Sequence, residues 1–345
     1  MRELVDELFA GEEAWVVGGA VRDQALGRPI VDLDVACRDP ERAARRFARR
    51  SGGAPFPLSE RHGAWRVALV DERTVDFTPL PGSIEDDLGT RDFTINAIAE
   101  PVGSDETVDP FGGHGDLGAR RIRAVKDSVF EDDPLRLLRA VRLEDELPHD
   151  FRMVPETEEL VRRDAALVTR PAGERILAEL GRLSPGGYRR IDSLGLLGPL
   201  GGVIDDRLDR WDSADYRLVA VFGEELRRLP VSNELRRFAT ALVRAERPQD
   251  DPRSIHRFRL ATEPWSLEAL AFVGATDLSP AIEGARKAEP KEPLLRGHEL
   301  GLPPGPEIGR LLAQIEEERA AGTIASKEEA LDYARRHSGA VREDG

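Results

Sequence analysis

The chain of 345 residues is poor in sulfur and in aromatic side chains, with one cysteine, two methionines and 6% Phe, Trp and Tyr. A single cysteine, Cys37, excludes an intramolecular disulfide and provides no cysteine cluster for zinc. No apolar run is as long as a membrane-spanning helix, and residues 1–15 are typical of an amphipathic helix, not of a signal peptide. These absences predict a cytoplasmic protein with no membrane partner.

Positive charge is scarce as well. The 50 Lys and Arg residues are outnumbered by 65 Asp and Glu residues, which leaves a formal net charge of −15. A surface of this sign disfavours indiscriminate nucleic-acid binding, which depends on basic side chains that displace counterions. It is compatible with a local arginine groove on an acidic body. The length favours two or three domains.

The clearest pattern that is present occupies residues 14–38. This stretch predicts a short buried strand, a turn at Gly18 and Gly19, a helix, and a second strand that carries Asp32 and Asp34. Strand side chains alternate between faces, so the two carboxylates point to the same side and repel each other unless a cation lies between them. Oxygen ligands suit Mg²⁺, and glycines ahead of a helix let backbone N–H groups approach phosphate. The stretch therefore predicts a polyphosphate site beside a divalent-metal site, as nucleotidyl transfer requires.

Two more charged residues extend this prediction. Arg22 falls in the first turn of the helix, where its guanidinium can grip a triphosphate with two parallel hydrogen bonds. Asp76 falls in a strand-like run, residues 74–78, and is a third carboxylate if that strand neighbours the one with Asp32. An exposed strand position is an equally supported interpretation of Asp76.

Residues 90–97 (TRDFTINA) contain more polar groups than a core segment needs. Arg91, Asp92 and Asn96 are suited to contacts with phosphate and ribose hydroxyls, while a capped turn with a surface arginine explains the same residues. Further along, the glycines of residues 111–118 resemble a dinucleotide fingerprint. No parallel-sheet unit surrounds them, so the sequence favours a turn there.

A second cluster of charge opens a predicted helix. Asp133 before a proline is ordinary N-cap chemistry. Arg136, Arg139 and Arg142 recur every three residues and form a cationic stripe along one side of that helix. Asp133 and Arg136 present an acceptor and a donor, the combination that the Watson–Crick edge of a base needs. A solvated ladder of salt bridges is the competing interpretation.

Secondary-structure periodicity changes along the chain. From about residue 126 the strand-like runs stop, and apolar residues recur at three- and four-residue spacing. The predicted fold class is therefore α+β, with a mixed head followed by an all-helical remainder.

Together these motifs resemble the class II tRNA nucleotidyltransferase and bacterial poly(A) polymerase family. The matching segments are VVGGAVRDQALGRPIVDLDVA, RDFTINAIA, DPFGGHGDL, DDPLRLLRAVR and GERILAEL, and the C-terminal segment GHELGLPPGPEIGRLLAQIEEERAAGTIASKEEAL resembles the family's tail. The likeness is dense across residues 14–183 and returns at residues 297–331. It implies a polymerase-β-like nucleotidyltransferase head and three helical domains: head 1–125, nucleotide-selecting neck 126–200, tRNA-binding body 201–285 and tRNA-binding tail 286–345.

The resemblance also implies roles for the side chains singled out above. Asp32 and Asp34 would bind two Mg²⁺ ions, and Asp76 is a candidate third catalytic carboxylate that assists the attacking hydroxyl. Asp133 and Arg136 would act as an amino-acid template that selects CTP or ATP. The full set of implied nucleotide-binding residues is Gly18, Gly19, Arg22, Arg91, Asp92, Asn96, Asp133, Arg136, Arg139 and Arg142.

Three features depart from the family's pattern. The template motif begins with Asp132 where the family usually has Glu, and Thr90 stands where the family usually has the first of two arginines. Only residues 79–83 separate DFT from IEDDL, where full CCA-adding members commonly have a long flexible loop. A connection this short resembles that of partial enzymes that add only the two cytidines.

The expected function is addition of CMP and AMP (CCA) to the 3′ end of tRNA, without a nucleic-acid template and by two-metal in-line transfer. The expected substrates are CTP and ATP, and the expected RNA partner is the tRNA acceptor stem with its 3′ end. CC addition, A addition and poly(A) synthesis stay open within the same chemistry. A non-catalytic RNA-binding relative is disfavoured by the intact carboxylate pair, and a small-molecule nucleotidyltransferase by the long helical remainder. The sequence leaves the oligomeric state open.

Overall fold

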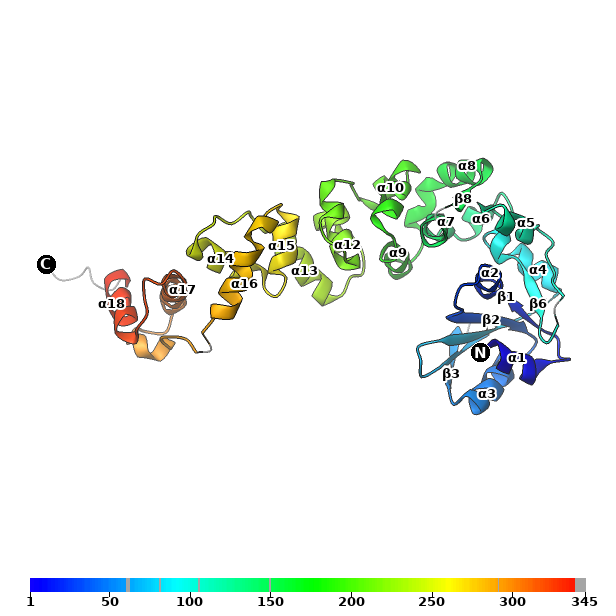
Figure 1. Cartoon of the computed structure of the whole chain (residues 1–345), viewed down its shortest axis with the longest axis horizontal. Helices are drawn as coiled ribbons and strands as arrows, with labels where there is room; N and C mark the ends of the chain where they lie inside the picture. The colour runs from blue at the N-terminus through cyan, green and yellow to red at the C-terminus, as the bar shows by residue number, and fades with distance from the viewer. Residues whose placement is uncertain (60–62, 81, 105, 149, 291, 339–345) are drawn as a thin grey trace. The chain divides into compact units, whose positions relative to one another are not determined.

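The computed structural model describes residues 1–59, 63–80, 82–104, 106–148, 150–290 and 292–338. Residues Met1–Leu200 form one compact unit and residues Gly201–Gly345 a second. The first unit contains the β-sheet and the second is built of helices (Figure 1). The predicted α+β class is confirmed, while the finer division into four domains stays a prediction.

The first unit opens with the head sheet and its helices and continues into a run of helices. Its elements are α1 (Arg2–Phe9), β1 (Ala14–Val17), α2 (Gly19–Ala25), β2 (Asp32–Cys37), α3 (Pro40–Ser51), β3 (Ala54–Ser59), β4 (Ala64–Ala68), β5 (Thr74–Pro79), α4 (Ile84–Gly89), η1 (Thr94–Asn96), β6 (Ala99–Pro101), α5 (Gly113–Gly118), β7 (Arg121–Ile122), α6 (Val129–Asp132), α7 (Arg136–Glu146), β8 (Arg152–Met153), α8 (Pro155–Arg163), η2 (Ala165–Thr169), α9 (Gly173–Leu180), α10 (Pro185–Ser193) and α11 (Leu197–Leu200).

The second unit consists of α-helices and short 3₁₀ turns. Its elements are η3 (Asp206–Asp209), α12 (Ala214–Phe222), η4 (Gly223–Arg228), α13 (Asn233–Val243), α14 (Pro252–Thr262), α15 (Ser266–Phe272), η5 (Thr276–Leu278), α16 (Ser279–Ala288), η6 (Gly297–Leu300), α17 (Pro306–Ala320) and α18 (Lys327–His337).

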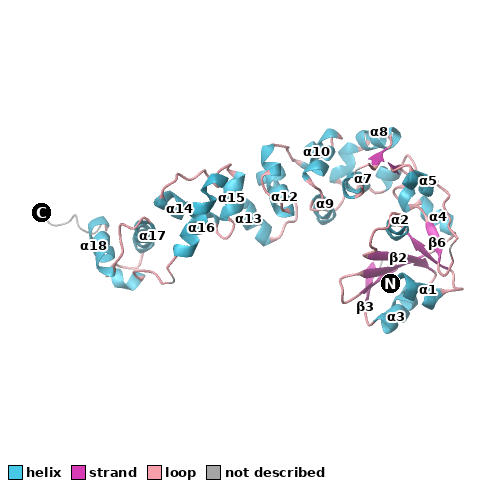
Figure 2. Ribbon diagram, in the orientation of Figure 1, coloured by secondary structure: helices cyan, strands magenta, loops and turns pink. Residues whose placement is uncertain are grey.

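The head sheet has six strands in the order β3-β4-β5-β2-β1-β6. Figure 2 shows strands of this sheet in magenta beside the helices of the head. β2 and β5 run parallel, and every other neighbouring pair is antiparallel. Alternation in β2 buries Leu33 and Val35 on one face, so Asp32 and Asp34 lie on the other. This is the arrangement that the sequence predicted for the two carboxylates.

The face of the sheet opposite the carboxylates packs against α1 and α3. Phe77 of β5 meets Phe9 of α1 and Phe47 of α3, with ring centroids 5.7 Å and 6.0 Å apart. All three rings are almost fully buried. Burial of three aromatic rings fixes the position of β5, and β5 in turn positions the strand that carries Asp32 and Asp34.

The carboxylate face is covered at one end only. Val17 and Ala36 form an apolar cluster there with Ile84 and Leu88 of α4. Asp32, at the other end of β2, remains exposed. The α4 helix therefore closes part of this face and leaves the aspartate end accessible. We call the side of the sheet that carries the two aspartates the open face.

Two local predictions were wrong. The glycine-rich residues 111–118 contain the helix α5, not just a turn, because Asp109 accepts hydrogen bonds from the backbone nitrogens of Gly113 at 2.7 Å and His114 at 2.9 Å and so caps that helix. A strand also occurs in the region expected to be all helical, because β8 pairs with β7 over two residues. Neither change alters the fold class.

The second unit has its own apolar cores. One core joins α17 and α18 to the segment before them and contains Leu295, Ile315, Ile324, Ala330 and Ala334. Within the described residues, no helix in either unit is both long enough and apolar enough to cross a membrane.

Candidate active site

Three carboxylates lie across two neighbouring strands of the head sheet. The parallel register of β2 and β5 places Asp34 opposite Asp76 and Asp32 opposite Thr74. Opposite residues share a face, so Asp76 meets the condition set for a third carboxylate. Asp76 is 9% exposed, which excludes the interpretation as an exposed strand position. Thr74 Oγ1 donates to Asp32 Oδ1 at 2.6 Å and orients that side chain.

Asp34 has a strongly perturbed acidity. Burial raises its pKa from 3.8 to about 6; Arg91 opposes the rise, whereas the negative charges of Asp76 and Asp32 add to it. The ionised carboxylate is therefore poorly stabilised by the protein alone. A cation placed beside it would relieve that cost, which makes the open face of the sheet suited to a metal ion here.

Asp76 is held by an arginine that the sequence pattern did not single out. Arg66 on β4 donates from Nε to Oδ1 and from Nη2 to Oδ2 of Asp76, both at 2.7 Å. The two residues are register partners on adjacent strands, so the pair is built into the sheet. This fork-to-fork geometry fixes the orientation of the carboxylate.

The turn between β1 and α2 needs glycine for two reasons. Gly18 has φ +76°, and a Cβ there would lie 2.8 Å from Arg91 Nη1 and 3.2 Å from Asp34 Oδ2. Arg91 is held in this position by two hydrogen bonds to Asp87, from Nε at 3.1 Å and from Nη2 at 2.9 Å. The backbone turn, a guanidinium and a carboxylate therefore come together without a side chain between them.

Arg22 on α2 has its guanidinium fixed from two sides. It donates to Asn96 Oδ1 at 2.8 Å and to both oxygens of Asp23, from Nε at 3.0 Å and from Nη2 at 2.9 Å. Asn96 in turn donates to Asp92 Oδ1 at 2.9 Å. The structure thus links Arg22 to the TRDFTINA segment, far away in the sequence.

Asp92 is the buried centre of a second network. It is 4% exposed and accepts from Arg139, with Nη2 at 2.7 Å and Nε at 2.9 Å from the same oxygen. Burial alone would raise the pKa of Asp92, but Arg139 and hydrogen bonds from Asn96 and the backbone of Phe93 hold that pKa below its ordinary value. Asp92 is therefore a charged residue that joins η1 to α7.

The side chains of Asp133 and Arg136 bond to different partners and not to each other. Asp133 accepts from Arg175 at 2.8 Å and from the backbone nitrogen of Leu135 at 3.2 Å. The N-cap interpretation was wrong, because α7 begins at Arg136 with Leu135 at its N-cap, and Asp133 instead follows the end of α6. Arg136 donates to the Thr90 carbonyl at 2.6 Å. Both side chains make contacts that an incoming base would have to exchange.

Arg142 differs from the other two arginines of the predicted stripe. It is 8% exposed and pairs with Glu179 at 2.6 Å and with Glu146 at 2.7 Å. The stripe is therefore not a solvated row of free cations, because Arg136, Arg139 and Arg142 each have partners in the protein. The interpretation as a salt-bridge network describes Arg142 best.

One cavity of about 600 Å³ gathers these side chains. Asp32, Asp34 and all the residues expected to bind nucleotide line it, and Asp76 does not. Asp23, next to Arg22, lines it too, as do three charged residues that the sequence pattern did not identify: Arg28, Glu146 and Arg182. Polyphosphate, base and metal sites would therefore share a single cleft of the first unit.

Comparison with known proteins identifies the family. Residues 14–123 match the Poly A polymerase head domain. The CC-adding tRNA nucleotidyltransferase of Thermus thermophilus is 32% identical to the chain, and the match covers 94% of each protein. The A-adding tRNA nucleotidyltransferase of Deinococcus radiodurans is 33% identical, over 94% of this chain and 95% of its own length. The chain belongs to the tRNA nucleotidyltransferase family.

The fold agrees with that membership. A CCA-adding enzyme solved in complex with CTP is similar over 98% of this chain and 94% of its own, with a TM-score of 0.76 and 21% identity. At that identity the likeness shows a shared fold. The family recognised from the sequence motifs is confirmed, and with it the expectation of a nucleotidyltransferase enzyme.

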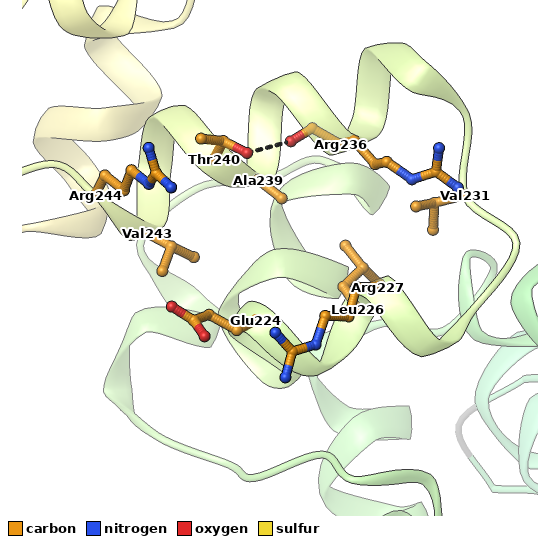
Figure 3. A pocket seen from close by; sticks show the side chains of 10 residues that line it. Glu224, Leu226, Arg227, Val231, Arg236, Ala239, Thr240, Val243 and Arg244 are labelled. Atoms are coloured by element: carbon orange, nitrogen blue, oxygen red, sulfur yellow. Dashed lines mark hydrogen bonds between the residues drawn. The ribbon is translucent and has the colours of Figure 1, made fainter.

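This tRNA nucleotidyltransferase chain has a further cavity of about 310 Å³ in its second unit, between η4 and α13 (Figure 3). Arg227, Arg236 and Arg244 line it, together with one acidic side chain, Glu224, and the apolar side chains of Leu226 and Val243. In the described part of the chain, the nearest acidic partner of Arg227 is Glu225 at 3.9 Å, whereas most arginines elsewhere have closer carboxylates. The second unit thus gathers positive charge locally on an acidic protein.

Proposed function

We propose that this chain extends the 3′ end of tRNA with CMP and AMP, without a nucleic-acid template. The observation that carries the proposal is the single cleft that brings Asp32 and Asp34 together with the expected nucleotide-binding residues. The two full-length relatives, a CC-adding and an A-adding tRNA nucleotidyltransferase, support tRNA and nucleotide triphosphates as the substrates. The primer 3′ hydroxyl attacks the α-phosphorus of the nucleotide in line, a P–O bond to the primer forms, and pyrophosphate leaves.

Magnesium fits the donor set of this site. Asp32 and Asp34 supply hard oxygen ligands on one face, and burial disfavours an uncompensated charge on Asp34. Within the described residues no three acidic, His or Cys side chains converge as a complete metal cage, so water and substrate phosphate would supply the remaining ligands. Two Mg²⁺ ions held by Asp32 and Asp34 would acidify the attacking hydroxyl and neutralise the leaving oxygens.

The remaining residues position the nucleotide. Backbone N–H groups of the turn at Gly18 and Gly19 would meet a phosphate beside Arg91. Arg22 would exchange its contacts with Asp23 for a fork with the triphosphate. These groups would bind the leaving pyrophosphate, which must be kept in line with the attacking hydroxyl.

Base selection is proposed for Asp133 and Arg136. A base that bonds to this pair exchanges the contacts to Arg175 and to the Thr90 carbonyl for its own Watson–Crick edge. A base with mismatched donors and acceptors would leave these polar groups unpaired, which costs about 1–3 kcal/mol for each buried group. Selection therefore follows from hydrogen-bond complementarity without a template strand.

A second candidate, addition of the two cytidines alone, is favoured by the connection between β5 and α4. β5 ends at Pro79 and α4 begins at Ile84, and Pro81 between them lies outside the described residues. The Ser83 hydroxyl caps α4 by accepting from the Asp86 backbone nitrogen at 3.1 Å. A connection this short, tied to a capped helix, resembles that of CC-adding enzymes.

The second unit is proposed to bind the tRNA. The expected body (201–285) and tail (286–345) fall in this unit, and the arginine-lined cavity at η4 and α13 lies in the body (Figure 3). Its guanidinium groups would meet backbone phosphates, which fits recognition of a folded RNA by shape. A cytoplasmic location is proposed on the same grounds, because tRNA is processed there.

Product sequencing tests the proposal. The purified protein is incubated with Mg²⁺ and a tRNA that lacks its CCA end, with CTP alone, ATP alone, or both. Addition of CCA followed by a stop supports full synthesis, and a stop after CC supports the second candidate. Long A tails would assign the chain to poly(A) synthesis, and a lack of any incorporation would leave a non-catalytic RNA-binding protein.

Base selection is tested in the same assay with UTP also present. Arg136→Ala should lose the distinction between CTP, ATP and UTP; unchanged selectivity would refute the template role.

A further inference from the structure

A row of four side chains crosses the open face of the head sheet. In register it contains Asp34 on β2, Asp76 on β5, Arg66 on β4 and Phe56 on β3. Because neighbouring strands lie about 4.8 Å apart, Arg66 begins roughly 10 Å from Asp34 along this row. Neither Arg66 nor Phe56 lines the nucleotide cleft. The row therefore extends the active site beyond the nucleotide.

The two sides of Asp34 differ in chemistry. On the β1 side lie the Gly18 turn and Arg91, which are proposed to hold the triphosphate. On the other side lie Asp76 and Arg66, on strands β5 and β4. In-line displacement needs the attacking and leaving oxygens on opposite sides of the phosphorus. With the triphosphate on the β1 side, the RNA 3′ hydroxyl arrives from the side of β5 and β4.

Arg66 has a donor to spare for that RNA. Its Nε and Nη2 are taken by the two oxygens of Asp76 at 2.7 Å. Its Nη1 has no hydrogen-bond partner in the residues that the structure describes, and its side chain is 33% exposed. A guanidinium in this state can hold the carboxylate and a phosphate at once.

We propose that Arg66 connects the incoming RNA to Asp76: it fixes the carboxylate through Nε and Nη2 and binds a backbone phosphate near the RNA 3′ end through Nη1. This inference rests on the proposed function, because it takes the RNA strand as the attacking substrate. Arg66 is then an RNA-binding residue, and a positioning residue for Asp76.

Phe56 completes the RNA platform. It is the register partner of Arg66 and is 41% exposed. An exposed aromatic ring beside an arginine is the combination on which unpaired bases stack. Phe56 therefore offers a stacking surface to a base of the single-stranded 3′ end, next to the phosphate bound by Arg66.

The test separates a phosphate contact from a structural role by its salt dependence. Affinity for tRNA lacking its CCA end is measured in EDTA over a series of KCl concentrations, with Arg66→Gln, Phe56→Ala and wild type. Loss of one phosphate contact lowers the slope of log Kd against log salt by about 0.7 for a single strand. Arg66→Gln should show this change and bind RNA about tenfold more weakly, the loss of one charge-assisted hydrogen bond. Phe56→Ala should weaken binding with the slope unchanged.

Arg45→Gln is the matched control for charge. Arg45 also lies against β4, but on the opposite face, where its guanidinium stacks 4.9 Å from the centre of the Trp65 ring. The Arg45→Gln variant removes the same formal charge from the head but no proposed phosphate contact. Its slope of log Kd against log salt should therefore equal that of wild type. An equal change of slope in Arg45→Gln and Arg66→Gln would show that net charge alone explains the change, and would overturn the proposal.

A conservative variant tests the link to Asp76. Arg66→Lys keeps the charge and loses the fork, so RNA affinity and salt slope should stay close to wild type while kcat falls at least tenfold and the Kd for CTP is unchanged. A kcat equal to wild type, or a weakened CTP affinity in place of RNA affinity, would overturn the proposal.

Thermal unfolding identifies any variant that fails to fold. If Arg66→Gln fails to fold, the measurements on Arg66→Lys alone test the proposal. Wild type that incorporates no CMP refutes the proposed function, whereas active wild type with an unchanged slope in Arg66→Gln refutes only this inference.

Discussion

Asp34 should destabilise the metal-free protein, and the size of that cost is set by its acidity. Burial raises its pKa from 3.8 to about 6 in the folded protein. The folded state therefore binds a proton more tightly than the unfolded chain, and the stability present below pH 4 is lost as the pH rises through 6. Two pKa units correspond to about 3 kcal/mol, an upper estimate at neutral pH.

The perturbation is Asp34→Asn, which keeps the shape of the side chain and removes its charge. In EDTA at pH 7.5 we expect the variant to be more stable than wild type by up to about 3 kcal/mol, or several degrees in melting temperature for a unit of this size. At pH 4 the difference should vanish, because wild-type Asp34 is then protonated. Catalysis should be lost at every pH.

The assay is thermal unfolding of wild type and variant from pH 4 to 8, with and without Mg²⁺. Added Mg²⁺ should stabilise wild type by mass action and leave Asp34→Asn unaffected. Asp71→Asn is the control, because Asp71 is an exposed carboxylate whose pKa Arg73 holds below its ordinary value, and it should bring no gain. An Asp34→Asn protein that is no more stable than wild type at pH 7.5 would refute the reasoning.

Two further substitutions test the rest of the cleft. Gly18→Ala forces a side chain into φ +76° and 2.8 Å from Arg91 Nη1, so we expect the KM for CTP to rise about tenfold with the fold retained; an unchanged KM would show that the turn is not a phosphate site. Asp92→Asn removes the charge that pairs with Arg139; Asp92 is 4% exposed and the Arg139 side chain is 38% exposed, so urea unfolding should show a loss of about 2 kcal/mol. A loss below about 1 kcal/mol would mean that the pair is not a structural link between η1 and α7.

Local patterns in the sequence predicted the parts of the site that depend on local geometry. The two-residue spacing of Asp32 and Asp34 fixes their common face, because alternation is a property of any strand. The glycine pair predicted the turn because glycine adopts a positive φ without strain. Asp76 could be placed only conditionally, since its role depends on β5 pairing with β2.

Partners across the fold could not be predicted from the sequence. Arg66 lies in the run WRVALV, and only the antiparallel register of β4 and β5 brings it to Asp76. Arg175 reaches Asp133 across 42 positions, through the packing of α9 beside α7. The three-residue spacing of arginines suggested one stripe, yet Glu179 draws Arg142 into a buried pair. Spacing along a helix determines its faces and not what each face meets.

The most direct test of the account is single-turnover transfer of CMP from labelled CTP to tRNA lacking its CCA end, with Mg²⁺, by wild type and by Asp32→Ala. Wild type should incorporate CMP and release pyrophosphate, and Asp32→Ala should bind the tRNA equally well and incorporate none. Retained incorporation by Asp32→Ala would contradict the assignment of the chemistry to this face of the head sheet.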